Sequence, residues 1–400
     1  MRRLDRAAAE VNPFLTVIAI GLVAVTLTSF AALAIKDALP SITRAAVHHP
    51  GWLPGVHNGV AGRVSLGHAG VLRRRVIGVA DNSDRASREG AMSLSLNAII
   101  EIPDAGVLFD HGAFDPKTRR VFVAHMARSR VEVIDHDTGR HVAALSGFPE
   151  AAGVVADDGQ VLVTNRGAAS LAWIDAQTLE TRAVLDTGPR PNGVALVARS
   201  RLAAVASIGD ETREPELQVL ELEGTQRWAI DLPGRPRWCV PDAAGTRLFL
   251  AIRDPSMILV ARLPDLGDVQ HWALPSGGAH GIDIDHRSGF LYVACDGGVL
   301  VEVDTVTGKV RGEWPLAGGP DATFFNPPSG LVHVAIGEPG LVQSIDPRTA
   351  VSRELSTALG AQTTALVPPD HLYVFSPYHR GVLDLVEALG TPHSGIYKAE

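Results

Sequence analysis

Short segments in which apolar and polar residues alternate, each followed by a polar turn, recur along most of the chain. Residues 121–145 show the unit. VFVAH and VEVID alternate, and the turn DTG leads into HVAAL. Alternation with a period of two is typical of β-strands, whereas an amphipathic helix repeats its apolar residues about every 3.6 positions. The pattern therefore predicts three consecutive strands here and an all-β protein.

The repeat has a regular period. The polar residue that closes the third strand of the unit recurs at steps of 38 to 46 residues, at Asp135, Asp175, Glu221, Arg262, Asp304, Asp346 and Asp384. This is the length of one four-stranded blade of a β-propeller. The sequence predicts a seven-bladed β-propeller, whose blades begin near Asp110, Glu150, Pro191, Pro236, Ala279, Pro320 and Ala361.

The last of these blades is short by one strand. It supplies only TTALV, HLYVFS and GVLDLVE, whereas residues 95–106 (SLNAIIEIPDAG) have the composition of the strand that precedes each blade. Closing a ring with a strand from the other end of the chain shortens the exposed sheet edges. We therefore expect this N-terminal strand to complete the seventh blade, and we place the propeller at residues 95–390.

Three segments carry a family resemblance. VFVAHMARSRVEVIDHDTGRHVAALSG, VLVTNRGAASLAWIDAQTLETRAVLDTGPRPNG and LYVACDGGVLVEVDTVTGKVRGEWPLAGGPD resemble YVTN-type β-propeller repeats, and the likeness extends over about residues 95–387. It implies the same fold, in a group that includes surface-layer-like, binding and enzymatic proteins. A weaker resemblance, to gluconolactonase-like and senescence-marker-like propellers, rests on Asn192 in RPNG and Asp321 in GPDATF. That one would imply a metal-dependent lactonase.

The N-terminal region predicts export. Residues 14–35 are 22 residues without a charge, long enough to span a bilayer, and Arg2, Arg3 and Arg6 precede them. We expect residues 1–13 in the cytoplasm, a transmembrane anchor at 14–35, and the propeller on the periplasmic or extracellular side.

Two alternatives to this anchor remain open. Ala32-Leu33-Ala34 is an acceptable signal-peptide cleavage site, so the protein could be secreted after cleavage. Translation from Met92 would instead leave the propeller in the cytoplasm. Residues 36–94, rich in Gly, Arg and Ser, are expected to form a flexible tether, and residues 391–400 a C-terminal tail.

Composition narrows the choice of partners. The net charge of -8 and the lack of a basic stripe interleaved with aromatic residues argue against a nucleic-acid partner. A closed ring leaves only short, protected edges, so we expect a monomer. The two cysteines, Cys239 and Cys295, form either a disulfide or two buried small apolar side chains.

One face of the ring is the candidate site. In a propeller the first strand of each blade lines the channel, so the residues at the blade starts should meet at its mouth: His111, Ala152, Asn192, Trp238, His280, Asp321 and Gln362. The loops after the second strands should open on the same face and add His125, Arg166, Arg253 and His379. A concave mouth with a few polar groups predicts binding of a small-molecule ligand or a protein partner.

Three of these residues suggest a metal. Two imidazoles and a carboxylate, from His111, His280 and Asp321, suit a divalent ion with an open position for water. Alternatively, the histidines satisfy backbone groups or bridge water. The sequence thus leaves three functions open: a ligand- or protein-binding module, a metal-dependent hydrolase or lyase of lactone-like substrates, and a structural cell-envelope protein.

Overall fold

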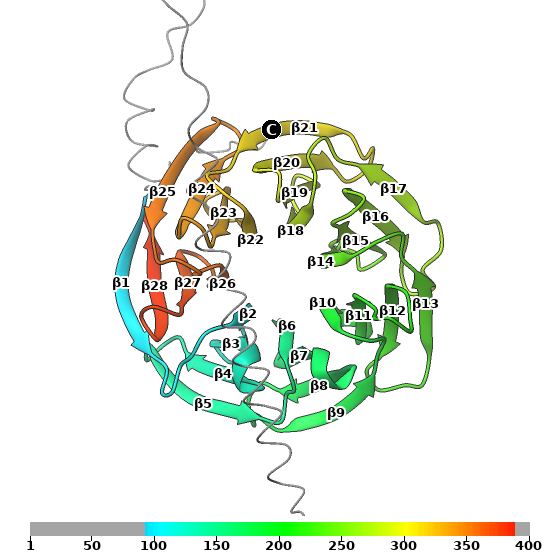
Figure 1. Cartoon of the computed structure of the whole chain (residues 1–400), viewed down its shortest axis with the longest axis horizontal. Helices are drawn as coiled ribbons and strands as arrows, with labels where there is room; N and C mark the ends of the chain where they lie inside the picture. Colours follow the sequence, from blue (N-terminus) through cyan, green and yellow to red (C-terminus); the bar gives the residue numbers. More distant parts are fainter. Residues whose placement is uncertain (1–92, 389–400) are drawn as a thin grey trace, which may run out of the picture. The chain divides into compact units, whose positions relative to one another are not determined.

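The computed structural model describes residues 93–388, which form a ring of seven four-stranded antiparallel sheets (Figure 1). In each blade the first strand lies nearest the central axis and the fourth lies on the outside (Figure 1). The predicted seven-bladed, all-β propeller is therefore confirmed. The predicted anchor at residues 14–35, the tail at 391–400 and nearly all of the tether predicted at 36–94 lie outside the described residues; Leu94, at the end of that predicted tether, is instead the first residue of a strand.

The strands follow one another in the same order in every complete blade. Blades 1 to 3 consist of β2 (Phe109–Asp115), β3 (Arg120–His125), β4 (Arg130–Asp135) and β5 (Arg140–Ser146); β6 (Ala151–Asp157), β7 (Gln160–Asn165), β8 (Ser170–Asp175) and β9 (Thr181–Asp186); and β10 (Pro191–Val197), β11 (Leu202–Ser207), β12 (Glu216–Glu221) and β13 (Arg227–Asp231). Blades 4 to 6 consist of β14 (Pro236–Pro241), β15 (Arg247–Ile252), β16 (Met257–Arg262) and β17 (Gln270–Ala273); β18 (Ala279–Asp285), β19 (Phe290–Cys295), β20 (Val299–Asp304) and β21 (Val310–Pro315); and β22 (Pro320–Asn326), β23 (Leu331–Ile336), β24 (Leu341–Asp346) and β25 (Val351–Ser356). Three short 3-10 helices follow strands of the first three blades: η2 (Met126–Arg128), η3 (Arg166–Ala168) and η4 (Ala198–Ser200).

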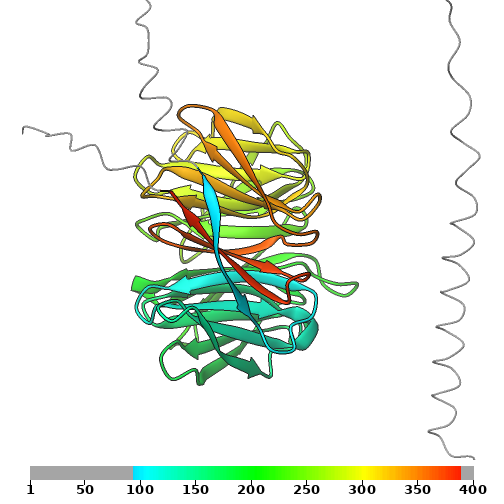
Figure 2. The ribbon, with the colours of Figure 1, turned by 90° about the vertical axis from the view of Figure 1, so that its left-hand side faces the viewer.

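The seventh blade joins both ends of the described chain. It is made of β26 (Thr363–Val367), β27 (His371–Ser376) and β28 (Gly381–Glu387), and its outer strand is β1 (Leu94–Glu101). Strand β1 runs antiparallel to β28, and the two lie side by side in Figure 2. The Asn97 side chain adds a hydrogen bond of 2.8 Å from Nδ2 to Asp384 Oδ2. The predicted closure by an N-terminal strand is confirmed.

Burial explains why the strands of a blade differ in sequence. Both faces of the second and third strands are covered by neighbouring blades, so β7 and β11 are buried at every position and read as nearly continuous apolar runs. The outer strand β5 instead alternates exposed and half-buried residues. Among residues 93–388 the buried apolar side chains form seven clusters, one between each pair of adjacent blades. Burial of apolar surface between blades therefore holds the ring together.

Both cysteines lie in this core. Cys239 and Cys295 are free and buried, so the second alternative from the sequence is correct. Burial raises the pKa of each thiol to about 12.

Within residues 93–388 none of the helices is both long and apolar enough to span a bilayer.

Candidate functional site

An irregularity at the start of six first strands brings side chains to the channel mouth. In β2, pairing with β3 passes from Phe109 directly to Gly112, so Asp110 and His111 are left out of the ladder. The same shift occurs in β6, β10, β14, β18 and β22. A β-bulge bends its strand and redirects the side chains that it leaves unpaired. The repeated bulges thus place one or two residues of each of these blades at the mouth.

Glycines next to the mouth residues let adjacent first strands approach closely. A Cβ atom added to Gly153, Gly193 or Gly281 would lie 2.1 to 2.3 Å from a backbone carbonyl oxygen of the next blade, namely that of Asn192, Arg237 and Asp321, respectively. No side chain fits at such a separation. The glycines therefore bring the residues of neighbouring blades together around a narrow opening.

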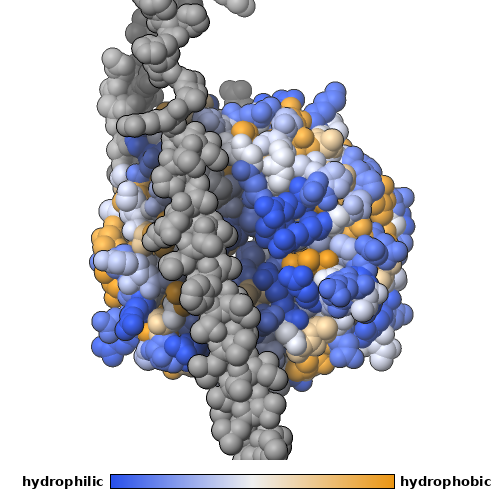
Figure 3. Space-filling view, viewed as in Figure 1, coloured by the Kyte–Doolittle hydropathy of each residue, from blue (hydrophilic) through white to orange (hydrophobic). Residues whose placement is uncertain are grey.

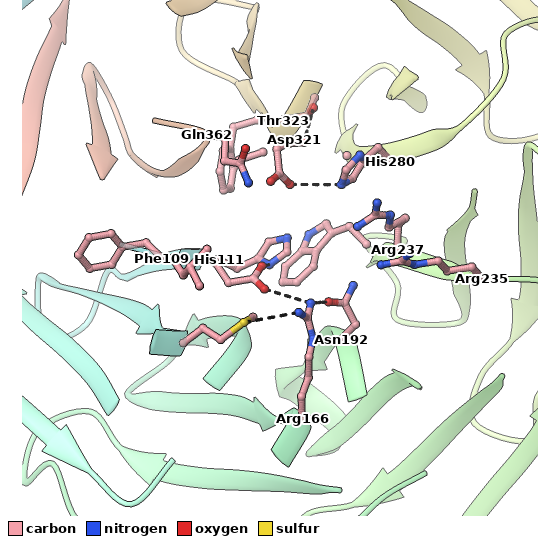
Figure 4. Close-up of a pocket in the computed structure, with 17 residues that line it drawn as sticks. Phe109, His111, Arg166, Asn192, Arg235, Arg237, His280, Asp321, Thr323 and Gln362 are labelled. Carbon is pink, nitrogen blue, oxygen red and sulfur yellow. Dashed lines mark hydrogen bonds and ion pairs between the residues drawn. The ribbon is translucent and has the colours of Figure 1, made fainter. Parts of the chain in front are cut away.

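The mouth contains a cavity of about 220 Å³ to which all seven blades contribute (Figure 4). Of the residues predicted from the sequence, seven line it: His111, Arg166, Asn192, Trp238, His280, Asp321 and Gln362. Asp110, Met126, Arg235 and Arg237 join them. Hydrophilic residues also gather around the central opening on the face of the ring shown in Figure 3. The cavity is small, is lined by both polar and apolar side chains, and is open to solvent through the mouth.

One wall of the cavity is a chain of polar contacts across blades 1 to 3. Asp110 lies 2.6 Å from Nδ1 of His111 through Oδ1 and 3.0 Å from Nη2 of Arg166 through Oδ2. Arg166 also donates a hydrogen bond to Oδ1 of Asn192. Burial alone would raise the pKa of Asp110, but His111, Arg166 and Arg237 outweigh it and lower the pKa. Asp110 is therefore an ionised carboxylate whose charge is already neutralised.

The aromatic part of the wall is a stacked pair. The rings of His111 and Trp238 are nearly parallel, with an interplanar angle of 7° and centroids 4.0 Å apart. The pair joins blades 1 and 4, which face each other across the mouth. The His111 ring therefore stacks on Trp238 with one face and contacts the Asp110 carboxylate through Nδ1.

The opposite wall is built around His280. Its Nδ1 lies 2.8 Å from Asp296 Oδ1 and its Nε2 lies 3.3 Å from Asp321 Oδ1. The other oxygen of Asp296, Oδ2, lies 2.6 Å from Nε of Arg253. Burial alone would lower the pKa of His280, but the two carboxylates outweigh it and raise the pKa. The same contacts overcome the effect of burial on Asp296 and lower its pKa to about 2.

Two arginines of blade 4 differ from these paired groups. Arg235 and Arg237 flank Pro236 at the start of β14, and within residues 93–388 neither guanidinium has an ion pair within 4.0 Å. Nε of Arg237 is buried and has no hydrogen-bond partner among the described residues. Burial, followed by the repulsion from Arg235, lowers the pKa of Arg237 to about 10. Asp321 and Asp296 attract Arg237 without forming a direct ion pair with it, and they do not offset the effect of burial, so part of the positive charge of the mouth stays uncompensated.

Four residues predicted for the mouth do not line the cavity, and one of them, Ala152, is completely buried. His125 is the last residue of β3 rather than part of a loop; it is completely buried, lies 2.7 Å from Glu132 Oε1 and stacks on Phe109. His379 contacts Ser376 Oγ at 2.8 Å, outside the cavity. Arg253 borders an adjoining depression and reaches the mouth only through Asp296. Strand register turns the His125 side chain into the interior of the blade.

The predicted metal triad is not assembled as one group. Only His280 and Asp321 are in contact, whereas His111 is engaged by Asp110 and Trp238. Among residues 93–388 no three His, Cys, Asp or Glu side chains are placed to hold a metal ion.

Comparisons with known proteins agree on the fold. No protein-family model matches the chain, and no curated protein matches its sequence. A solved structure of hydrazine synthase from Kuenenia stuttgartiensis is similar with a TM-score of 0.62 and 14% identity, over 72% of this chain and 97% of that one. A streptogramin B lyase structure is similar with a TM-score of 0.59 and 14% identity, over 74% and 97%. At such identities the likeness supports the β-propeller fold alone; the likeness to YVTN-type repeats stays a prediction.

Sequence reasoning missed Arg235 and Arg237, although a signal was present. Taking one residue per blade selected Trp238 and passed over its neighbour. The bulge in β14 leaves both Arg237 and Trp238 outside the regular pairing with β15. The run RPRW, with a proline at the blade start as in blades 3 and 6, marks the two arginines as mouth residues.

Proposed function

We propose that the propeller is a ligand-binding module that holds a small molecule in the cavity at the channel mouth. One observation carries this proposal: side chains from all seven blades converge on a single cavity of about 220 Å³. Binding sites are usually concave, with an apolar or aromatic surface and a few convergent polar groups. Here the stacked His111 and Trp238 supply the aromatic surface, and Arg237, His280 and Gln362 supply polar groups.

The size of the cavity restricts the ligand. A volume of about 220 Å³ lies below the roughly 300 to 1,000 Å³ of typical ligand pockets, so the ligand must be small. A metabolite-sized molecule fits such a space, whereas a folded partner could insert only the tip of a side chain. A small-molecule ligand is therefore favoured over the protein partner that the sequence also allowed.

A pocket-filling substitution tests the proposal. Gln362 is exposed and lines the cavity, so Gln362→Trp should fill it without disturbing the core. Leu359 is 68% exposed in the segment that leads to Gln362 and does not line the cavity, so Leu359→Trp is the matched control. A compound library is screened by thermal unfolding against both variants and the unchanged protein. A compound at ten times its Kd should stabilise the protein by about 1.4 kcal/mol, or a few degrees in Tm.

Loss of these shifts in Gln362→Trp but not in Leu359→Trp would support the cavity as the binding site. Equal shifts in both variants, or no shift with any compound, would contradict it. In the second case the predicted structural role in the cell envelope becomes the better explanation.

We also propose that residues 14–35 hold this module at the membrane, on the periplasmic or extracellular side. The support is their length without a charge and the three arginines before them. Protease added to intact cells stripped of any outer barrier should degrade the propeller, and the cell-associated chain should keep its N-terminus. A mature chain that starts after Ala34 would instead indicate secretion, and a protected chain that starts at Met92 would indicate the cytoplasm.

The alternative of a metal-dependent hydrolase or lyase has a narrower basis, the contact between His280 and Asp321 in the cavity. Elemental analysis of the purified protein, with His280→Ala measured beside it, tests this alternative. One equivalent of a divalent metal that disappears in the variant would favour it over simple binding.

A further inference from the structure

We propose that the ligand of the mouth cavity carries an anionic oxygen group, a carboxylate, phosphate or sulfate, which binds between Arg235 and Arg237. This inference rests on the proposed function, because it names the ligand class for the same cavity. It is carried by the distribution of charge around the mouth.

Charge pairing around the cavity leaves out these two arginines. Three arginines and two aspartates line the cavity. Asp110 is paired with Arg166 and His111, and Asp321 is paired with His280. Just outside the lining, Asp296 is taken by Arg253 and His280. Every carboxylate near the mouth thus already has a cationic partner. Among the described residues, Arg235 and Arg237 are left without a direct ion pair.

The position of Arg237 makes this imbalance costly. Arg237 is half-buried, and its buried Nε donates no hydrogen bond to the described residues. A buried charge without a partner destabilises a fold unless something compensates it. The pKa of Arg237 is lowered to about 10, mainly by burial and then by Arg235. Burial and the charges of Arg253 and Arg166 lower the pKa of Arg235 as well. A bound anion would reverse both effects.

The geometry favours a small oxyanion over a larger acidic partner. A guanidinium presents several N–H donors in a plane, which matches carboxylate and phosphate oxygens. Two such groups on either side of Pro236 can hold one anion from two directions, within a cavity of about 220 Å³. Arg235 also borders an adjoining depression lined by Arg253, Ser256 and Asp296. The uncharged remainder of a ligand has room to extend there.

Calorimetric titration of the full-length protein at low ionic strength tests the inference, because salt screens such contacts. The probes are inorganic phosphate, sulfate and succinate, with succinamide as the neutral counterpart of succinate. The variants are Arg237→Gln and Arg235→Gln. Arg201→Gln removes the same charge from an exposed arginine that pairs with Glu223, so it is the matched control. Arg237→Lys keeps the charge and serves if Arg237→Gln does not fold.

At least one anion should bind to the unchanged protein and to Arg201→Gln, and succinamide should not. Loss of a charged hydrogen-bond donor should weaken that binding about tenfold to a hundredfold in Arg237→Gln. Arg235→Gln should weaken it in the same direction, and Arg237→Lys less than Arg237→Gln. Equal affinity of the anion for Arg237→Gln and Arg201→Gln would overturn the inference, as would the absence of binding by every anion.

The pocket-filling screen separates this failure from that of the proposed function. If neutral compounds bind in a manner blocked by Gln362→Trp while no anion binds, the mouth is a ligand site and only its assignment to anions is wrong. If neither class binds, both the inference and the proposed function fail.

Discussion

Replacing Glu132 with glutamine should destabilise the propeller by about 3 kcal/mol at neutral pH. Glu132 lies in β4, and its side chain is completely buried. Its Oε1 lies 2.7 Å from Nδ1 of His125 and 2.5 Å from Nε of Arg130. Its Oε2 lies 2.8 Å from Nε2 of His141. An ionised carboxylate can only accept hydrogen bonds, so all three neighbours must donate.

The magnitude follows from the pKa of Glu132. Burial alone would raise it, but the hydrogen bonds from His125, His141 and Arg130 outweigh burial and lower it from 4.5 to about 2. One pKa unit corresponds to about 1.4 kcal/mol, so the ionised form is favoured in the folded protein by about 3 kcal/mol. Because the folded pKa lies below the unfolded one, this stability is fully present above pH 4.5 and is lost as the pH falls through 2.

Urea unfolding of both proteins between pH 7 and pH 2 measures the effect. The difference in the free energy of unfolding should be about 3 kcal/mol at pH 7 and should shrink toward zero near pH 2, where Glu132 itself becomes protonated. The control is Glu302→Gln in β20, also between two valines. Burial raises the pKa of Glu302, so neutralising it should leave stability equal or higher. A loss for Glu132→Gln that persists unchanged at pH 2, or no loss at pH 7, would refute the electrostatic explanation.

Three further outcomes follow from the structure. Gly281→Ala should cost roughly 1 to 3 kcal/mol, because its Cβ would meet the Asp321 carbonyl oxygen at 2.3 Å; Gly277→Ala, with no atom within 4 Å of its Cβ, should cost less in the same urea experiment. Cys239 and Cys295 should resist a thiol reagent until the protein is unfolded, since both are buried with a raised pKa; rapid labelling of the native protein would contradict this. Internal deletion of β1 should lower Tm and promote association through the exposed edge of β28, measurable by calorimetry and light scattering, and an unchanged monomer would show that the closing strand is dispensable.

The fold could be predicted because residues that perform the same local task mark the period in several blades. Asp135 ends β4, and its Oδ1 accepts hydrogen bonds of 2.8 Å from the backbone N–H and the hydroxyl of Thr138, which fixes the following turn. Asp304 ends β20 and accepts from the backbone of Thr307 in the same way. Such carboxylates recur because each turn needs an acceptor for its N–H groups. A residue with a purely local role keeps its spacing, so it measures the repeat reliably.

The site could be predicted only in outline, because it depends on the direction of side chains. Aligning the blade starts located most of the cavity, but a shift of one residue in a strand turns a side chain to the opposite face. His125 shows the consequence: it ends β3 instead of beginning the loop, and it points into the blade toward Glu132. Position along the repeat identified the neighbourhood of the mouth, and strand register decided which side chains face it.

The bulges explain why the charge of the mouth was missed. A bulge leaves consecutive residues outside the ladder, so blades 1 and 4 each present a pair, Asp110 with His111 and Arg237 with Trp238. Counting one residue per blade kept the aromatic second residues, His111 and Trp238. It left out the charged first residues, Asp110 and Arg237. In this ring the second members stack on each other across the opening, while the first members set its electrostatics. The aromatic pair therefore shapes the cavity, and under the proposed function Arg237, the residue before Trp238, would favour an anionic ligand over a neutral one.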